Sequence, residues 1–349
     1  MAPPTMKAIK IVEADKAEIQ TVPLPQLRDD YVLVKVNKVA LNPTDWKHIA
    51  FLAQPGATVG CDFSGTIQAV GKDVQKSWKE ADRIASFAHG ANAVQLEDGC
   101  FGEYCVAKGD LGLKVPDSMT DTEAATLGVG VTTVGQGLYQ SLNLPLPQSG
   151  RGEGGVLLVY GGSTATGSLA IQYARLSGWE VVTTCSERNF GFVKELGAKE
   201  AFDYKDPECA RKIREFTGDR LGKVFDCISA GESPKICSEA VGSKGGVVSY
   251  LLPAQHERQD VENKMTLGYT VNGEMFYFGP QEWKARPDDL EFGKKFWALS
   301  EKLFAEGKLK VHPPQEEKGG LQGVFDGMQA LREQRVSGKK LVYDVNETS

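Results

Sequence analysis

The sequence has 349 residues, of which 41% are hydrophobic and 25% are charged, and its formal net charge is −6. This composition is typical of a globular protein with a substantial core, and the length favours two domains at roughly 150 residues each. The sequence has no long basic run, which argues against nucleic-acid binding. It also has no apolar stretch of the roughly 18 residues that a membrane-spanning helix needs. We therefore expect neither nucleic acid nor membrane among its partners.

The N-terminal residues and the cysteines both favour a cytoplasmic protein. Residues 1–6 lack the positive region and apolar core of a signal peptide. The seven cysteines are scattered along the chain. An odd number without regular spacing suits free thiols in a reducing compartment better than a disulfide framework.

The first third of the chain indicates a β-rich domain. Residues 31–40 alternate in polarity, and residues 62–71, 82–86 and 102–107 are further short strand patterns separated by glycine-containing turns. Short strands of this kind are typical of an antiparallel, barrel-like domain. Residues 144–155 are rich in proline and glycine and predict an exposed loop.

Residues 156–167 predict the first strand and turn of a dinucleotide-binding unit. Four apolar residues and Tyr160 are followed by two glycines and small hydroxylated residues, and a helical pattern runs from Leu169 to Leu176. Small residues let the backbone approach a pyrophosphate, and a helix N-terminus offers free N–H groups. The pattern indicates a nicotinamide or flavin cofactor. Thr164 and Ala165 replace the usual middle glycines, so the turn alone is also compatible with an ordinary strand-turn-helix unit.

Strands and helices alternate over the following residues, which is the pattern of a doubly wound parallel sheet. We expect strands at residues 180–185, 201–204, 223–228 and 245–250, and helices at residues 189–196, 206–217 and 235–241. A long helical pattern begins near residue 280, and a final strand at residues 340–344 should rejoin the β domain. The predicted fold class is α/β, with the β domain at residues 1–135 and 280–349 and a Rossmann domain at residues 136–279.

This order of domains resembles the medium-chain dehydrogenase/reductase superfamily. Residues 40–45 are similar to its Asn-Pro-x-Asp segment, and residues 59–67 resemble its Gly-x-Asp-x-x-Gly-x-Val strand. Residues 160–166, 184–190 and 202–204 look like segments of the stand-alone, trans-acting enoyl reductases of fungal polyketide pathways. The resemblance implies a GroES-like antiparallel β-barrel domain plus a Rossmann domain. It also implies NADPH-dependent reduction of the carbon–carbon double bond of a carrier-bound polyketide.

The sequence lacks the ligands of a catalytic zinc ion. Zinc-dependent members of the superfamily use Cys, His and Cys or Asp, whereas no thiol lies near Pro43, and Cys61 and Asp62 stand where His and Glu are usual. A structural zinc lobe needs four closely spaced cysteines, and residues 88–112 contain only Cys100 and Cys105. We expect no metal. This favours reduction of an activated C=C bond, because the conjugated carbonyl already polarises the acceptor carbon.

The segment after the second parallel strand favours NADPH over NADH. Ser186, Arg188 and Asn189 can donate hydrogen bonds to a 2′-phosphate, and Arg188 adds positive charge. Glu187 opposes this interpretation, and Ser186 and Asn189 would also serve as helix caps. The resemblance implies further cofactor contacts. These are Thr44, Asp45, Trp46, Lys47, Ser163, Thr164, Ala165, Thr166, Tyr204, Leu251, Leu252, Lys340 and Leu341.

Lys47 is the candidate catalytic residue. In the family this position lies beside the nicotinamide, where an ammonium group could stabilise an enolate and donate a proton. The alternative is a solvated lysine. The adjacent His48 could assist Lys47, although we expect it to face away. The resemblance also implies two substrate segments, for which ordinary glycine-containing linkers are the alternative. They are Thr133, Val134, Gly135, Gln136, Gly137, Leu138, Tyr139 and Gln140, and Asn272, Gly273, Glu274, Met275 and Phe276.

Two other functions stay open from the sequence. A quinone or 2-alkenal reductase would use the same hydride transfer on a free small acceptor, and an accessory protein would bind NADPH without turnover. Neither a serine-hydrolase elbow nor a phosphate-binding loop is present. The expected partner is a polyketide thioester on the acyl carrier domain of a polyketide synthase. The sequence is compatible with a monomer or a homodimer.

Overall fold

The computed structural model describes residues 3–147 and 154–348, so part of the loop predicted at residues 144–155 lies outside the described residues. Residue contacts divide the chain into two compact units. The first comprises residues 1–132 and 269–349, and the second comprises residues 133–268. Residues 269–279, which we expect in the Rossmann domain from the sequence, are thus part of the first unit.

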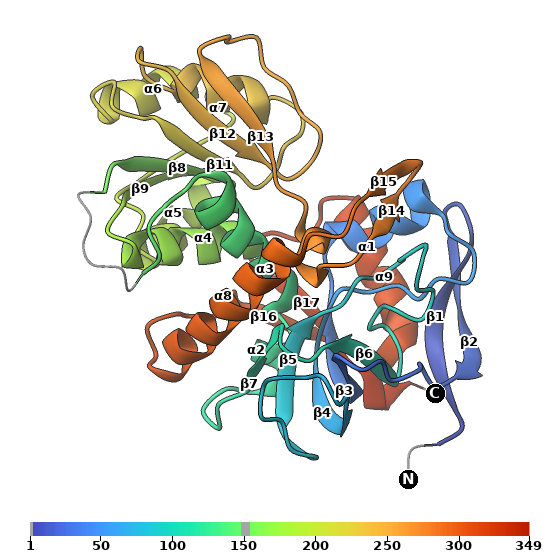
Figure 1. The fold of residues 1–349 in the computed structure, drawn as a ribbon. Helices are drawn as coiled ribbons and strands as arrows, with labels where there is room; N and C mark the ends of the chain where they lie inside the picture. The colour runs from blue at the N-terminus through green and yellow to red at the C-terminus, as the bar shows by residue number, and fades with distance from the viewer. Residues whose placement is uncertain (1–2, 148–153, 349) are drawn as a thin grey trace. The chain divides into compact units, whose positions relative to one another are not determined.

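The first unit is built around a seven-stranded sheet (Figure 1). The strands, in spatial order, are β16 (Pro314–Glu317), β17 (Lys340–Asp344), β3 (Tyr31–Ala40), β4 (Asp62–Val70), β5 (Arg83–Phe87) and β7 (Gly112–Lys114), and β6 (Tyr104–Lys108) also pairs with β3. Only β16 and β17 run parallel; the other pairs are antiparallel. The structure therefore confirms the antiparallel β domain and the return of the final strand to it.

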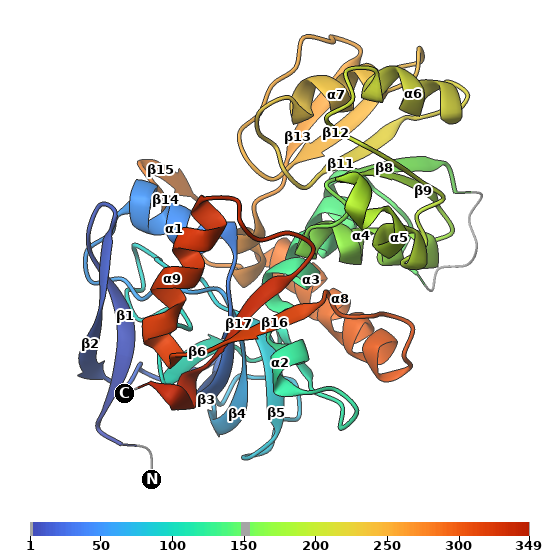
Figure 2. The same cartoon turned by 180° about the vertical axis from the view of Figure 1, so that it is seen from behind.

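Strand β3 pairs with three strands of this sheet, β4, β6 and β17. Its first half pairs with β6, and its last three residues pair with β17. The alternating pattern of the strand buries Val32, Val34 and Val36 in the core. Helix α9 (Gly320–Arg332) lies beside β17 in Figure 2 and adds Leu321 and Val324 to the same core. The hairpin of β1 (Thr5–Glu13) and β2 (Lys16–Pro23) was not predicted from the sequence.

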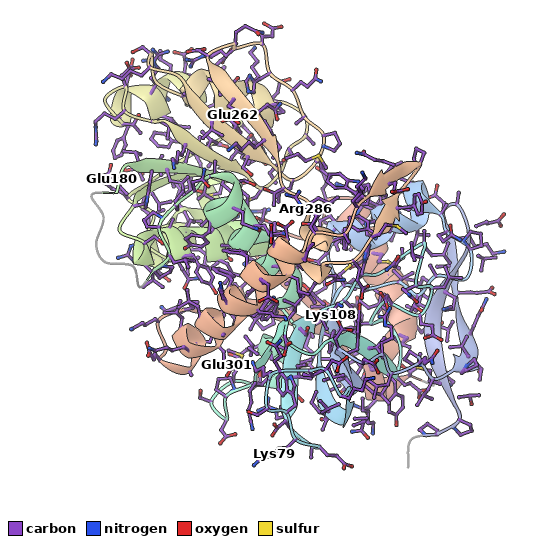
Figure 3. All side chains as sticks on the ribbon, viewed as in Figure 1. Lys79, Lys108, Glu180, Glu262, Arg286 and Glu301 are labelled. Atoms are coloured by element: carbon purple, nitrogen blue, oxygen red, sulfur yellow. The ribbon has the colours of Figure 1, made fainter. Side chains whose placement is uncertain are left out.

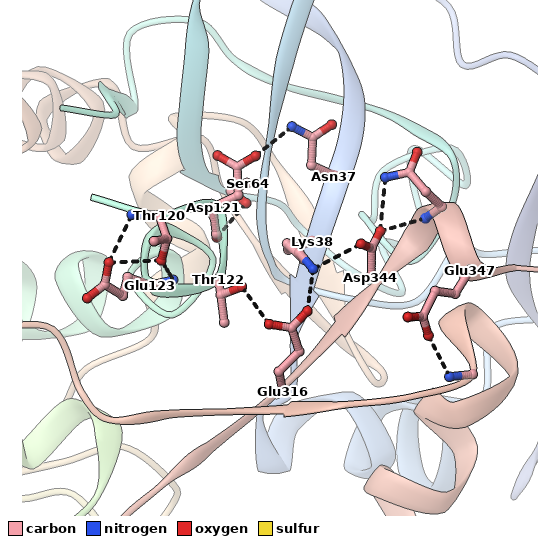
Figure 4. Close-up of polar contacts among 12 residues, drawn as sticks. Asn37, Lys38, Ser64, Thr120, Asp121, Thr122, Glu123, Glu316, Asp344 and Glu347 are labelled. Carbon is pink, nitrogen blue, oxygen red and sulfur yellow. Dashed lines mark hydrogen bonds and ion pairs between the residues drawn. The ribbon is translucent and has the colours of Figure 1, made fainter. Parts of the chain in front are cut away.

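A partly exposed polar cluster joins β3 to the two C-terminal strands (Figure 4). The Lys38 Nζ atom lies 2.5 Å from Glu316 Oε1 and 2.9 Å from Asp344 Oδ2. Thr122, in helix α2 (Asp121–Ala124), donates a hydrogen bond of 3.0 Å to Glu316. The cluster therefore ties α2, β16 and β17 to one lysine of β3.

The second unit contains a six-stranded sheet in which every neighbouring pair is parallel. The strand order is β10 (Glu200–Phe202), β9 (Glu180–Thr184), β8 (Val156–Tyr160), β11 (Lys223–Asp226), β12 (Gly246–Tyr250) and β13 (Val261–Met265). This is the order of a dinucleotide-binding Rossmann sheet. The five strands predicted from the sequence are confirmed. The sixth, β13, was missed because it is an edge strand whose central residues are polar and largely exposed.

Helices connect these strands close to the predicted positions. They are α4 (Ala165–Leu176), the short turn η3 (Glu187–Asn189) with α5 (Phe190–Glu195), α6 (Cys209–Phe216) and α7 (Ser233–Ala240). Helix α3 (Gly128–Val134) and the wider turn η2 (Gly135–Ser141) lead into the unit.

The C-terminal helical region differs from the prediction. A hairpin of β14 (Phe276–Phe278) and β15 (Gln281–Trp283) comes first, and helix α8 (Pro287–Ala305) begins only at Pro287. Proline is favoured in the first turn of a helix because its missing N–H has no partner there. None of the helices in the described part of the chain combines the length and apolar character that crossing a membrane requires.

Candidate active site

The turn after β8 has the tight geometry that a pyrophosphate site needs. Thr164 caps helix α4: its hydroxyl donates to the Gly161 carbonyl at 2.8 Å and accepts from the Gly167 N–H at 2.9 Å. Gly161 has a φ of +82°, in the left-handed region. A Cβ atom on Gly167 would lie 2.3 Å from the Gly161 carbonyl oxygen. The backbone is therefore close enough to the helix start that only glycine fits at position 167.

The cofactor residues predicted in the second unit gather at one edge of its sheet. Residues 163–166 follow β8 and are half-buried, and residues 186–189 follow β9, with Glu187 and Arg188 exposed. Tyr204 follows β10, and its ring centroid lies 6.4 Å from that of Tyr160. Leu251 and Leu252 follow β12. Parallel strands end at a common edge, and ligands of such sheets bind there.

The first predicted substrate segment packs inside the second unit. Residues 133–139 are buried, and only Gln140 is half-buried. The Tyr139 hydroxyl lies 3.0 Å from Ser177 Oγ at the end of α4, and a Cβ atom on Gly137 would lie 2.3 Å from the Phe225 ring. Packing inside the unit therefore accounts for the glycine at position 137 and the tyrosine at position 139. Contact of this segment with substrate stays a prediction.

In the first unit, the Asn-Pro-x-Asp segment forms the start of a short helix, α1 (Pro43–Lys47). Asn42 precedes the helix, and the Asp45 carboxylate accepts the Asn42 N–H at 2.7 Å, as in a capping box. Asp45 is fully buried, and this burial raises its pKa to about 8. Asp45 therefore holds the loop from inside the unit.

Lys47, at the end of α1, is half-buried. Its Nζ atom lies 5.7 Å from the Trp46 ring centroid, and the Arg332 guanidinium lies 5.5 Å from the same ring. Burial lowers the pKa of Lys47. A lysine with a lowered pKa gives up its proton more readily, which suits a proton donor.

Lys340, another predicted cofactor residue, forms a buried ion pair with Asp62. Its ammonium group also donates to Asn42 Oδ1 at 2.8 Å, and Asn42 donates to Asp62 at 3.0 Å. The Val129 N–H donates to the other oxygen of Asp62. Lys340 thus neutralises a buried carboxylate, and Leu341 packs in the core beside it.

A cluster of three side chains, Thr44, His48 and Tyr269, lies next to this segment. Thr44 Oγ1 is 2.8 Å from His48 Nε2 and 3.2 Å from the Tyr269 hydroxyl, and Tyr269 is 3.2 Å from His48 Nε2. We call these three residues the Thr44 cluster. His48 Nδ1 lies 3.1 Å from the Gly90 carbonyl oxygen. Burial lowers the pKa of His48 to about 4, so the ring is neutral near pH 7.

The second predicted substrate segment lies beside the Thr44 cluster. His89 stacks on Tyr269 at 4.1 Å, and Phe276 meets His89 edge to face at 5.0 Å. Glu274 accepts a 3.0 Å hydrogen bond from Tyr31 and forms a 2.8 Å ion pair with Lys108, which Figure 3 labels. Within this segment, only Met275 is exposed. The structure therefore places Phe276 of this segment beside His89 and Tyr269, whereas Glu274 contacts Tyr31 and Lys108.

Sequence reasoning missed two members of the Thr44 cluster. His48 was expected to face away, yet its ring contacts a predicted cofactor residue. The spacing of Thr44 and His48, four residues apart at the start of a helix, was a usable signal for this contact. No comparable signal exists for Tyr269, which lies 225 residues from Thr44 along the chain.

Cys61 and Asp62, which stand in the position of catalytic zinc ligands, contact other side chains: Cys61 contacts Tyr269, and Asp62 pairs with Lys340. Cys61 Sγ lies 3.6 Å from the Tyr269 hydroxyl, and burial raises the pKa of the Cys61 thiol well above its usual value. Metal binding requires the thiolate, which this environment disfavours. Within residues 3–147 and 154–348, no three His, Cys, Asp or Glu side chains are grouped so that they could hold a metal ion.

Comparison with known proteins identifies the class to which this architecture belongs. The model of the alcohol dehydrogenase GroES-like domain matches residues 28–117, and the model described as zinc-binding dehydrogenase matches residues 165–290. The CurK enoyl reductase structure is similar with a TM-score of 0.74 and 20% identity, covering 97% of this chain and 99% of that chain. The two-domain fold of the medium-chain dehydrogenase/reductase superfamily, predicted from the sequence, is confirmed.

Two fungal relatives are similar over almost their whole length. The trans-enoyl reductase ACTTS2 of Alternaria alternata is 46% identical over 98% of this chain and 99% of its own. The trans-enoyl reductase resD of Aspergillus sclerotiorum is 42% identical over 97% of this chain and 99% of its own. The chain belongs to the trans-enoyl reductase family of the medium-chain dehydrogenase/reductase superfamily. This confirms the family predicted from the sequence motifs.

Proposed function

We propose that this protein is a trans-acting, NADPH-dependent enoyl reductase that reduces the α,β double bond of a polyketide thioester. The substrate is carried on the acyl carrier domain of a separate polyketide synthase. The observation that carries the proposal is the 46% identity to a named trans-enoyl reductase over 98% of this chain. The protein is accordingly an oxidoreductase that acts on a carbon–carbon double bond.

The edge of the parallel sheet supports the choice of cofactor. The first N–H groups of a helix have no intrahelical partner, and the close Gly161–Gly167 approach keeps the start of α4 beside the end of β8, where a pyrophosphate would accept hydrogen bonds from N–H groups that are not used by the Thr164 cap. Ser186, Arg188 and Asn189 would hold a 2′-phosphate, and the exposed Arg188 supplies the charge. When bound, NADPH supplies the hydride that reduces the β carbon of the substrate.

Lys47 is the proposed catalytic residue. Hydride arrival at the β carbon leaves an enolate, whose negative charge an ammonium group stabilises before donating a proton to the α carbon. The lowered pKa of Lys47 favours this donation. Burial disfavours the thiolate form of Cys61, and this fits a substrate that needs no Lewis acid, because the thioester carbonyl activates its own double bond.

The test combines purified protein with NADPH and a short 2-enoyl thioester, and it follows the absorbance of the reduced nicotinamide. We expect oxidation of NADPH, with the saturated thioester identified by mass spectrometry. A free quinone and a free 2-alkenal are assayed in parallel. Turnover with these acceptors and none with a thioester, including one loaded on a carrier domain, would contradict the proposal. NADPH binding without turnover of any acceptor would indicate an accessory protein.

A further inference from the structure

The contacts of His48 determine which of its ring nitrogens carries the hydrogen atom. Nδ1 lies 3.1 Å from the Gly90 carbonyl oxygen. A carbonyl oxygen only accepts hydrogen bonds, so Nδ1 carries the hydrogen and donates it. Because the buried ring is neutral, Nε2 has no hydrogen and acts only as an acceptor.

This tautomer also sets the direction of the Thr44 hydroxyl. Thr44 Oγ1 lies 2.8 Å from Nε2, the shortest contact of the cluster. Two bare lone pairs would repel at this distance, so the contact contains a hydrogen, and only Thr44 can supply it. The Tyr269 hydroxyl, 3.2 Å from Thr44, can then donate to the threonine oxygen. The Thr44 hydrogen therefore points into the protein.

Neighbouring rings hold this arrangement in place. The His48 ring neighbours Tyr269, at a centroid distance of 5.5 Å, and Phe278, at 5.9 Å, and these two rings are 6.2 Å from each other. His48 and Tyr269 are buried, whereas Thr44 is half-buried. A ligand that reaches the cluster therefore meets the Thr44 oxygen, whose hydrogen already points away.

We propose that His48 and Tyr269 are positioning residues that make Thr44 a hydrogen-bond acceptor toward the bound cofactor. The inference rests on the proposed function and specifies the polarity of one contact within it. Thr44 takes a donor from NADPH, either a ribose hydroxyl or the carboxamide N–H, and it disfavours an oxygen that can only accept. Sequence alone leaves this polarity open, because a threonine hydroxyl can donate or accept.

The experiment measures dissociation constants for NADP⁺ and for its nicotinic acid analogue, in which a carboxylate replaces the carboxamide. Thr44→Val should weaken NADP⁺ binding roughly tenfold, and Thr44→Ser should stay within about twofold of the wild type. His48→Phe keeps an aromatic ring but removes the acceptor, and should weaken binding about threefold. In the Thr44→Val background, His48→Phe should cause no further loss, because its effect passes through Thr44.

The analogue separates the two possible donors. If the carboxamide donates to Thr44, the wild type should discriminate against the carboxylate. His48→Phe should reduce that discrimination, because a released Thr44 can turn and donate. If a ribose hydroxyl is the donor, Thr44→Val should weaken both ligands equally. A purely structural role for His48 would leave the discrimination unchanged and would weaken binding equally in both backgrounds.

His89→Phe is the matched control. His89 is a second buried histidine, and its ring stacks on Tyr269. It should leave binding within about twofold of the wild type. If His48→Phe does not fold, as judged by its melting curve, Tyr269→Phe replaces it in the same cycle. Unchanged binding by Thr44→Val, or losses that multiply in the double variant, would overturn the inference. A wild type that fails to bind NADP⁺ or NADPH would instead overturn the proposed function.

Discussion

Lys47 is half-buried beside the Trp46 ring, and burial lowers its pKa. Its proposed role as proton donor can be tested by substitution. Lys47→Ala should lower kcat about 10²- to 10⁴-fold, the usual contribution of a positioned proton donor. The dissociation constant of NADPH should change by less than about threefold. Lys47→Arg keeps the charge but has too high a pKa to donate a proton readily, so it should recover only part of the rate. Steady-state kinetics and fluorescence titration measure both quantities. Unchanged kcat in Lys47→Ala would exclude the role.

A second prediction concerns the choice between NADPH and NADH. Arg188 is exposed in η3, directly after β9. Arg188→Ala should weaken NADPH binding roughly tenfold or more, because a charged hydrogen bond to the 2′-phosphate is lost, and it should change NADH binding by about twofold at most. The adjacent Glu187→Gln is the control, and it should strengthen NADPH binding slightly by removing a like charge. Equal losses for both cofactors in Arg188→Ala would contradict the assignment.

The residue scale also shows where sequence interpretation reaches its limit. Thr44, Asp45 and Lys47 could be proposed because they are neighbours in one recognisable segment. The contacts around these residues could not be predicted, because the partners lie far away in the chain. Tyr269 contacts Thr44 across 225 positions, and in the same region Lys340 pairs with Asp62 across 278 positions. Local patterns carry residue type and spacing, whereas hydrogen-bond direction depends on tertiary contacts.

At the scale of elements, the buried Asp62–Lys340 pair links the first residues of β4 and β17. Lys340→Met should destabilise the first unit by about 3–5 kcal/mol, because it leaves an unpaired buried carboxylate. Adding Asp62→Asn should recover much of this loss. Denaturant unfolding measures each free energy. The partly exposed Lys38–Asp344 pair joins β17 to β3 (Figure 4), so Lys38→Met is the control, with an expected cost of about 1 kcal/mol or less. Similar losses of unfolding free energy in Lys340→Met and Lys38→Met would contradict the distinction between a buried and a partly exposed ion pair.

The β8–α4 turn supports another prediction. Gly167→Ala should separate the helix start from the strand end, because its Cβ atom would lie 2.3 Å from the Gly161 carbonyl oxygen. We expect lower stability of the second unit and a weaker affinity for NADPH, measured by thermal unfolding and titration. Gly191→Ala, in α5, is the control: no heavy atom lies within 4 Å of its added Cβ atom, so stability should stay constant or rise by up to about 1 kcal/mol. Equal NADPH affinity in Gly167→Ala and the wild type would contradict this account of the turn.

The strands that could be predicted from the sequence have a common character. β8, β9 and β11 are short, largely buried runs that lie inside a parallel sheet. The missed strands are those of the β1–β2 hairpin and five further strands that have polar residues or only three residues, namely β7, β13, β14, β15 and β16. Such strands are defined by their partners more than by their own composition.

For the whole molecule, buried titratable groups predict how stability depends on pH. Burial lowers the pKa of all four histidines, to about 4 for His48 and about 3 for His312. Below about pH 6.5 the histidines of the unfolded chain therefore bind protons that the same histidines do not bind in the folded chain. Their contribution to the free energy of unfolding should fall as the pH falls from 6.5.

Asp45 acts in the opposite direction. Its folded pKa of about 8 lies above its ordinary value of 3.8, so the folded chain holds a proton that the unfolded chain has lost. This contribution should decrease stability as the pH rises from about 4 to 8, and it opposes the histidine contribution below pH 6.5. Asp45→Asn should flatten that part of the profile. Unfolding free energies at a series of pH values measure it, and an unchanged slope in Asp45→Asn would contradict the assignment.

The path of the chain through its two units also orders events on the ribosome. Residues 133–268 form a contiguous unit, so all six parallel strands can leave the exit tunnel and fold as soon as they are made. The first unit, although begun earlier, must wait for residues 314–344, because β17 supplies the partner of the last residues of β3. Until Lys340 is translated, the nascent chain carries Asp62 without its counter-charge. Of the two units, the one whose residues are made first is therefore completed last, and until then the last residues of β3 lack their β17 partner.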